Sequence, residues 1–160
     1  MTVGRFRGFL IAGALLTAPV NVSGQMTVGP LLGYENDAGF GIGASLGNAL
    51  GDLGDLGEGF GWLADLIVFF PDAGSYAELN GNVTYDIPLD DSNVVPFVLG
   101  GLNLARTSIA GDSNTSLGLN LGGGVDFDLG TFRPTAGVRA QLEGGDGLIF
   151  FITLPLQTGG

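Results

Sequence analysis

Charged side chains recur on the polar faces of strand-like runs in this sequence, and they are the residues best suited to chemistry. They are Asp65, Glu78, Asp86, Asp126, Asp128, Glu143, Arg133 and Arg139. A carboxylate and a guanidinium that meet away from water form a strong charge-assisted pair, whereas either one alone is costly to bury. The set therefore predicts ion pairs inside the fold or charges solvated at its ends. For Asp86, Asp128 and Arg133 we favour solvation at the ends.

Catalytic chemistry has little support in the sequence. The segment Gly43-Ala44-Ser45-Leu46-Gly47 matches the G-x-S-x-G pattern of hydrolases, which requires a strand-to-helix turn and a His base. The chain contains no His and no Cys, and the motif lies within a strand-like run. The serine thus lacks its usual activating base, and a zinc site lacks its usual ligands. We expect a non-enzymatic protein with no catalytic residue, no cofactor and no metal site.

The element that positions these side chains is the strand with one apolar and one polar face. The segment from Ser116 to Leu129 shows this pattern clearly. Its apolar positions include Leu117, Leu119, Leu121, Val125 and Phe127, and Gly, Ser, Asn and Asp occupy the positions between them. Successive side chains of a strand point to opposite faces, so the two classes of residue are predicted to face opposite ways.

Eight runs of this kind follow residue 25, and turns rich in Gly, Asp, Asn and Pro separate them. We expect strands at Met26–Tyr34, Gly39–Gly47, Phe60–Phe70, Tyr76–Ile87, Val95–Ala105, Ser116–Leu129, Arg133–Glu143 and Leu148–Leu156. Pro30 weakens the first of them, and the alternation of the third is blurred. Short connections join antiparallel neighbours. We therefore predict an all-β fold, an eight-stranded antiparallel up-and-down β-barrel that closes so that no strand edge stays open.

The first residues are typical of an export signal. Arg5 and Arg7 precede a short apolar segment at residues 9–18, and small residues precede a cleavage point near Gln25. We expect a signal peptide at residues 1–24 and a single barrel domain at residues 25–160. The alternative is that this segment forms a buried N-terminal helix.

Alternation alone does not distinguish a soluble barrel, with its apolar face inside, from an outer-membrane barrel, whose apolar face meets lipid. Several features favour lipid. The runs are close to the roughly 9–11 residues that cross a bilayer as a tilted strand. The chain has no lysine, mean hydropathy is +0.41, and the polar faces are rich in small residues that suit a narrow bore. A transmembrane barrel is the favoured prediction, and an exported soluble barrel that binds an apolar ligand inside is the alternative.

Two segments resemble a known family. Pro96–Ala105 has a Pro-aromatic entry followed by glycines, and Leu117–Phe127 is a Gly-rich strand. Together they resemble the small outer-membrane β-barrel proteins of Gram-negative bacteria, of the eight-stranded OmpA-like type. The resemblance implies a protein of the bacterial outer membrane, with membrane lipid and the outer-membrane assembly machinery as partners. Members of this family often end on an aromatic residue that this machinery recognises, whereas Gln157–Gly160 follow the last expected strand here.

The resemblance also orients the barrel. With both chain ends in the periplasm, as in the family, the turns near Asn36, Asp72, Asp112 and Gly145 would face the outside. These connections are short, so a large receptor or adhesive surface is not expected.

In such a barrel the third and seventh strands stand opposite each other, and Asp65 and Arg139 lie near the middle of these strands. We hypothesise that the two side chains approach each other across the bore, with Glu78 nearby. The predicted polar network of the bore consists of Asp65, Glu78, Asn80, Asn120, Arg139, Gln141 and Glu143. We expect a structural role or a narrow pore. An excess of acid in the bore would favour small cations if water passes.

The charge balance bears on partners. The chain carries 16 Asp and Glu against 5 basic residues, for a net charge of −11. Phosphate contacts need basic groups, so we expect no nucleic-acid partner.

Two details of the apolar face depart from or refine the scheme. Arg106 shares its face with Leu102 and Leu104, so it either reaches the lipid headgroups or changes face at a bulge at Gly100-Gly101. Aromatic residues near strand ends would form the girdles of a membrane barrel. These residues are Tyr34, Trp62, Phe70 and Tyr85.

Overall fold

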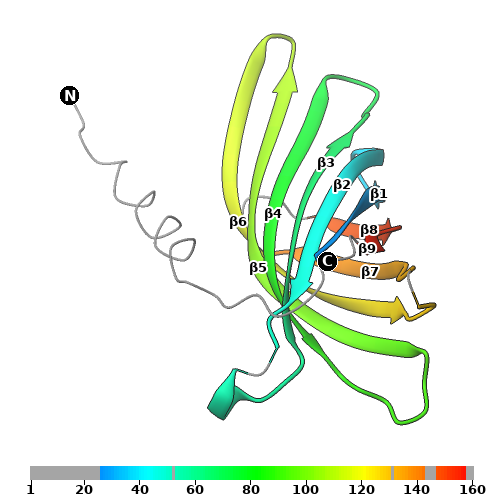
Figure 1. Cartoon of the computed structure of the whole chain (residues 1–160). Coiled ribbons are helices and arrows are strands. Elements are labelled where there is room, and N and C mark those ends of the chain that lie inside the picture. Colours follow the sequence, from blue (N-terminus) through cyan, green and yellow to red (C-terminus); the bar gives the residue numbers. More distant parts are fainter. Residues whose placement is uncertain (1–25, 52, 131, 143–146, 158–160) are drawn as a thin grey trace.

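The computed structural model of the chain describes residues 26–157, except 52, 131 and 143–146 (Figure 1). The signal peptide expected at residues 1–24 therefore lies outside the described residues, as does Glu143. The strands are β1 (Thr27–Glu35), β2 (Gly39–Ala49), β3 (Phe60–Phe69), β4 (Ser75–Asp86), β5 (Val94–Ile109), β6 (Asp112–Phe127), β7 (Thr135–Gln141), β8 (Leu148–Thr153) and β9 (Leu156–Gln157). A one-turn 3-10 helix, η1 (Gly54–Leu56), lies between β2 and β3.

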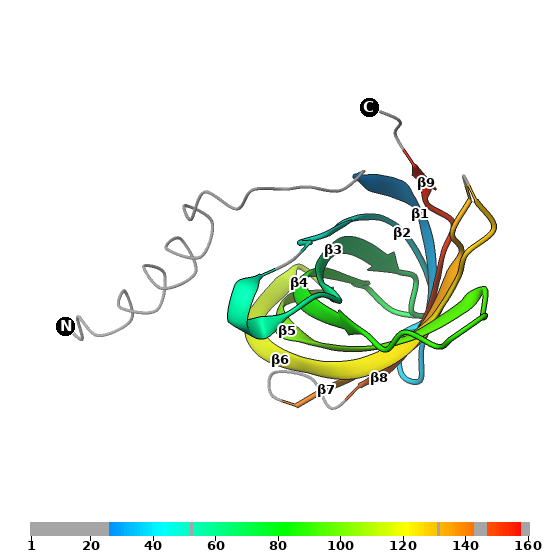
Figure 2. The same ribbon diagram turned by 60° about the horizontal axis from the view of Figure 1, so that its bottom comes forward.

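The strands form one closed antiparallel sheet. Each strand from β1 to β8 pairs with its sequence neighbour, and β1 pairs with β8 as well as β2, which closes the ring. The short strand β9 follows Pro155 and extends the line of β8 along the start of β1. Figure 2 shows the resulting ring of strands. The predicted eight-stranded up-and-down barrel is confirmed.

The two ends of the barrel differ. The described ends of the chain and the β2–β3, β4–β5 and β6–β7 connections lie at one end, here called the terminal end. The β1–β2, β3–β4 and β5–β6 connections lie at the opposite end, here called the turn end, together with the expected turns at residues 36, 72 and 112. Residue 145 lies outside the described residues. Among the described residues, no helix is long and apolar enough to span a bilayer.

The outer wall of the barrel is apolar. Leu117, Leu119 and Leu121 of β6 are 62%, 43% and 58% exposed, whereas the alternate residues Gly118 and Asn120 are buried. The same alternation appears along β1, β4, β5 and β8. The leucines therefore point away from the bore, as a lipid-facing wall requires, and they do not fill the interior as in a soluble barrel.

The bore is filled in layers. Near the turn end, an apolar cluster contains the buried residues Leu31, Ala38, Ile67, Phe69 and Ile149. Near the terminal end, a second apolar cluster contains Phe97, Leu99 and Phe151. Buried polar and charged side chains from β3, β4, β6 and β7 occupy the level between the two clusters. The inward face is thus partly apolar, which also explains the blurred alternation of β3, because its inward residues include Leu63, Ile67 and Phe69.

The β5–β6 hairpin is longer than predicted and rises above its neighbours at the turn end (Figure 1). Its ladder continues from Ala105↔Ser116 to Ile109↔Asp112 through Ser, Thr and Asn residues. The turn consists of Ala110 and Gly111, with φ of 52° and 91°, which is typical of a tight two-residue hairpin. The pairing also runs without interruption through Gly100 and Gly101, so the bulge considered there is wrong.

Glycines on the inward faces allow the strands to coil tightly. A Cβ atom on Gly101 would lie 2.1 Å from the carbonyl oxygen of Gly81 and 2.6 Å from Cα of Asn82. Both neighbours are backbone atoms, so the β4–β5 ladder itself would have to shift. At Gly81, on the outward face of β4, an added Cβ would meet nothing within 4 Å.

We therefore expect Gly101→Ala to lower the free energy of unfolding by about 1–3 kcal/mol, as overpacking does. Gly81→Ala, in the same ladder, should change it by less than about 0.5 kcal/mol. Urea unfolding of the refolded variants in detergent micelles measures both values. Equal stability of the two variants would contradict the close backbone approach at Gly101.

Candidate functional site

The polar layer of the bore is built around Arg139 of β7 and Asp65 of β3. The strand pattern turns both side chains inward, and the ring places the two strands on opposite sides of the bore. Arg139 Nη1 donates to Asp65 Oδ2 at 2.7 Å and Nη2 donates to Asp65 Oδ1 at 2.9 Å. Both side chains are 0% exposed. This is a bidentate, fully buried ion pair, the strongest form of such a contact.

Glu78 of β4 is the second carboxylate of this layer. It accepts hydrogen bonds from the Tyr76 hydroxyl and from the Gln141 side-chain amide. Its Oε2 atom also lies 3.6 Å from Arg139 Nη2. Two buried carboxylates thus share one guanidinium, and the hydrogen-bond donors around Glu78 supply the remaining stabilisation that a buried charge requires.

Asparagines extend the network across the sheet. Asn80 donates to Asp65 Oδ1 at 2.9 Å. Asn120 of β6 donates to Asn80 Oδ1 at 2.9 Å and to Asn82 Oδ1 at 3.1 Å. These contacts join β6 to β4 across β5. They can form because Gly101 of β5, which lies between Asn82 and Asn120 in the sheet, has no side chain. The layer is therefore tied to strands on both sides of the bore.

Six of the seven residues predicted for the network come together in the structure. They are Asp65, Glu78, Asn80, Asn120, Arg139 and Gln141. Glu143 lies outside the described residues. Tyr76 and Asn82 also belong to the network, and both share the predicted polar face of β4. Asn103 of β5 is buried at the same level, and neither atom of its side-chain amide has a hydrogen-bond partner. Asn103 alternates with the outward-facing Leu102 and Leu104, and this alternation in the sequence would have predicted that its side chain points into the bore.

Aromatic and aliphatic side chains close the bore above and below this layer. Phe151 lies under the guanidinium of Arg139, whose central carbon is 5.5 Å from the ring centroid. Phe69 and Ile67, on the turn-end side, are each 0% exposed. The bore is therefore packed at three successive levels along its axis.

Each end of the bore has a cavity. The cavity at the terminal end has a volume of about 290 Å³, and Asp86, Asp126 and Arg133 are among its lining residues. The cavity at the turn end has a volume of about 490 Å³ and is lined in part by Glu35 and Tyr76. The packed layers lie between the two. Asp86 and Arg133 are thus half-buried in a cavity, whereas Asp128 is exposed as expected.

The remaining predictions about chemistry concern Ser45 and Arg106. Ser45 lies inside β2 and its hydroxyl donates to the carbonyl oxygen of Gly29 at 3.4 Å, so the G-x-S-x-G segment forms no strand-to-helix elbow. Arg106 stays on the outward face, exposed, and donates to the Ser113 hydroxyl at 3.4 Å near the turn end.

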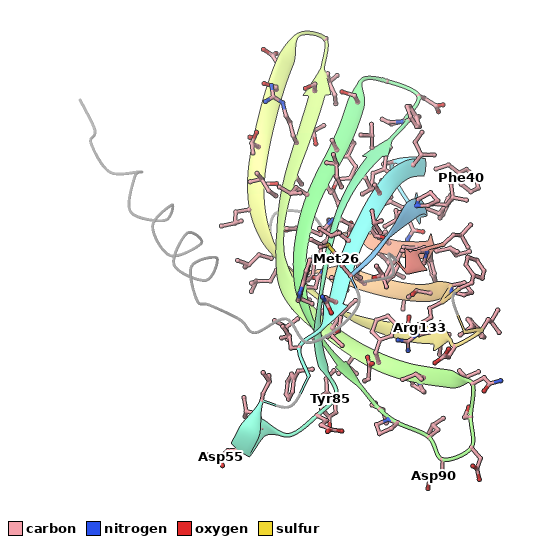
Figure 3. The ribbon with its side chains drawn as sticks, in the orientation of Figure 1. Met26, Phe40, Asp55, Tyr85, Asp90 and Arg133 are labelled. Carbon is pink, nitrogen blue, oxygen red and sulfur yellow. The ribbon has the colours of Figure 1, made fainter. Side chains whose placement is uncertain are left out.

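Aromatic pairs mark the outer wall near both ends. The rings of Tyr34 and Phe40 are 5.1 Å apart near the turn end, and those of Phe60 and Tyr85 are 5.0 Å apart near the terminal end. Figure 3 shows Phe40 and Tyr85 on opposite parts of the barrel, with Asp55 and Asp90 in the connections beyond Tyr85. Two aromatic levels separated by an apolar wall are typical of a barrel that spans a bilayer.

Three solved structures share this architecture. The N-terminal β-barrel domain of Pseudomonas aeruginosa OprF matches over 83% of this chain and 99% of its own, with 16% identity and a TM-score of 0.62. This chain has the fold of the small outer-membrane β-barrels. Neisserial surface protein A matches over 82% of this chain and 94% of its own, with 16% identity and a TM-score of 0.56. Ail, the attachment invasion locus protein of Yersinia pestis, matches over 84% and 95%, with 15% identity and a TM-score of 0.53.

No family model and no curated protein matches the chain in sequence. The likeness is therefore one of fold. The apolar exterior is that of a barrel whose outer wall meets lipid.

Proposed function

We propose that this chain is a non-enzymatic barrel of the bacterial outer membrane whose bore is closed, so that it acts as a structural membrane protein and not as a pore. The observation that carries this proposal is the bidentate Arg139–Asp65 pair, 0% exposed, between two apolar clusters. Membrane lipid would contact the outer wall, and the outer-membrane assembly machinery would insert the barrel.

Energetics support a bore that stays closed. An ion that crosses the polar layer would have to displace Asp65 or Glu78 from Arg139, and removing one partner of a buried pair costs about 3–5 kcal/mol. The apolar clusters would then have to admit water at two further levels, and hydrophobic constrictions of this kind resist wetting.

The narrow cation-favouring pore is the second candidate. Acidic residues line both end cavities, among them Glu35 and Asp37 at the turn end and Asp86 and Asp126 at the terminal end. These cavities would attract cations to either mouth. They support conduction only if the packed layers between them open.

Conductance in planar lipid bilayers separates the two candidates. The refolded full chain is expected to give no current steps above the background of protein-free bilayers. Reproducible steps that carry K⁺ better than Cl⁻ would contradict the closed bore and support the pore. A large open porin in the same bilayers controls for the sensitivity of the recording.

A further inference from the structure

The terminal-end cavity contains charged side chains that the closed barrel does not use. Asp86 lies at the end of β4, Asp126 near the end of β6, and Arg133 just before β7. The register places them along one stretch of wall, because Asp86 pairs with Phe97 and Asp126 pairs with Thr135. One guanidinium and two carboxylates therefore face a common space.

Arg133 is near enough to attract both carboxylates, but it is in direct contact with neither. Within the described residues, Arg133 forms no ion pair, and its Nε atom is buried without a hydrogen-bond partner. Asp126 accepts a hydrogen bond from the Thr135 hydroxyl. A buried donor left unsatisfied costs about 1–3 kcal/mol. A ligand that brings an acceptor to Arg133 would remove this cost.

The cavity has the size of a small-molecule site. Its volume of about 290 Å³ lies at the lower edge of the roughly 300–1,000 Å³ typical of ligand pockets. Leu63 and Phe97 are inward residues of its lining, and both belong to the apolar cluster that closes the bore at this level. The cavity therefore combines an apolar inner surface with charged groups of both signs, as a specific pocket requires.

We propose that this cavity binds a small molecule with one carboxylate and two ammonium groups, as in a dibasic amino acid. The carboxylate pairs with the Arg133 guanidinium, whose fork of donors matches carboxylate geometry. The ammonium groups pair with Asp86 and Asp126, and the methylene chain lies against Phe97. Charge decides the ligand class: the site has one more carboxylate than guanidinium, so a ligand with one net positive charge neutralises it. A bare anion would meet two carboxylates, and a bare metal cation would meet the guanidinium.

Calorimetric titration of the refolded full chain in detergent micelles tests this proposal with three matched probes. L-lysine carries all three groups, L-norleucine lacks the side-chain ammonium, and cadaverine lacks the carboxylate. We expect saturable binding of lysine, and binding at least ten-fold weaker for each of the other two. The backbone amide signals of Thr84, Phe97 and Thr135 should shift with lysine in NMR spectra. No saturation by lysine, or equal affinity for all three probes, would overturn the proposal.

Single substitutions test which charged residue of the cavity pairs with which charged group of lysine. Arg133→Met should reduce lysine affinity at least ten-fold while strengthening cadaverine binding, because the two carboxylates then face the two ammonium groups without a competing guanidinium. Asp86→Asn should remove the preference of the site for lysine over norleucine. Asp128→Asn is the matched control, because Asp128 is exposed and does not line the cavity. Unchanged lysine binding by Arg133→Met contradicts the assignment. The heat-dependent shift of gel mobility checks that each variant is folded, and the three probes decide the question on the parent chain if a variant does not fold.

This inference is independent of the closed bore. A barrel that conducts ions could still bind lysine at its terminal end, and a barrel that does not conduct could fail to bind it. The conductance and calorimetry results therefore contradict the two proposals independently.

Discussion

Replacing Arg139 by alanine is expected to lower the free energy of unfolding by about 3–5 kcal/mol, because two buried carboxylates lose the guanidinium that they share. Asp65 would lose both hydrogen bonds of the bidentate pair, and Glu78 would lose its nearby guanidinium. Neither carboxylate can reach water, since both side chains are 0% exposed. Urea unfolding in detergent micelles, followed by circular dichroism, measures the loss.

Arg106→Ala is the matched control for this prediction. Arg106 is exposed and makes one long hydrogen bond to Ser113, so its removal should change stability by less than about 0.5 kcal/mol. A double-mutant cycle of Asp65→Asn and Arg139→Gln should show a coupling of about 0.5–3 kcal/mol, as expected for residues in contact. If the Arg139→Ala variant were as stable as the Arg106→Ala variant, the buried network would not contribute to the stability of the barrel.

The second large effect is expected on the outer wall. Leu119 lies near the middle of β6 and is 43% exposed on the apolar face. Leu119→Arg should destabilise the barrel in lipid vesicles by about 2–4 kcal/mol, the cost of a cation at the bilayer midplane on a lipid-facing strand. Urea titration of folding into vesicles of defined lipid measures this cost.

Leu129→Arg provides the control for the lipid-facing position. Leu129 is 61% exposed, but it lies in the β6–β7 connection, beyond the end of β6 at the terminal end. The same substitution there should cost only about 0–1 kcal/mol. Equal costs at the two positions would show that depth in a bilayer does not matter, and hence that the wall around Leu119 does not face lipid.

The barrel could be predicted from the sequence because the outer wall repeats one simple pattern. Leu117, Leu119 and Leu121 alternate with small or polar residues, and a period of two admits only a strand with one apolar face. Turn residues between such runs then give the number of strands and their antiparallel order. The contact of Asp65 with Arg139 followed from the same logic, because the strand order of a closed ring places β3 opposite β7.

The contents of the bore were harder to predict, because an inward apolar residue looks the same in sequence as an outward one. Ile67 and Phe69 broke the alternation of β3, and their placement inside depends on glycines of other strands that make room for them. A Cβ atom on Gly33 would lie 2.3 Å from the Ile67 side chain, and one on Gly137 would lie 2.4 Å from the Phe151 ring. Gly137 lies opposite Phe151 in the β7–β8 ladder, and Gly33 is separated from Ile67 by one strand, so both pairs depend on strand register, which the pattern of a single strand does not reveal.

The sequence did not predict the ends of strands where the apolar alternation stops but the backbone hydrogen bonds between strands continue. Residues 106–115 of the β5–β6 hairpin carry little apolar alternation, yet the ladder runs on to Ile109↔Asp112. Cross-strand hydrogen bonds need no apolar side chain, and a two-residue turn suffices to close the hairpin. At the other end of the chain, Pro155 lacks an amide donor, and the last expected strand is interrupted there into β8 and β9.

The most direct test of the central claim is the accessibility of spin labels on neighbouring residues of β4 in lipid vesicles. The chain contains no cysteine, so Val83→Cys and Thr84→Cys each provide a single labelling site. Val83 is 54% exposed on the outer wall, whereas Thr84 lines the terminal-end cavity. We predict that oxygen dissolved in lipid reaches the label at residue 83 and that a water-soluble nickel complex reaches the label at residue 84. The reverse result would mean that the apolar face lines the interior and would contradict the account.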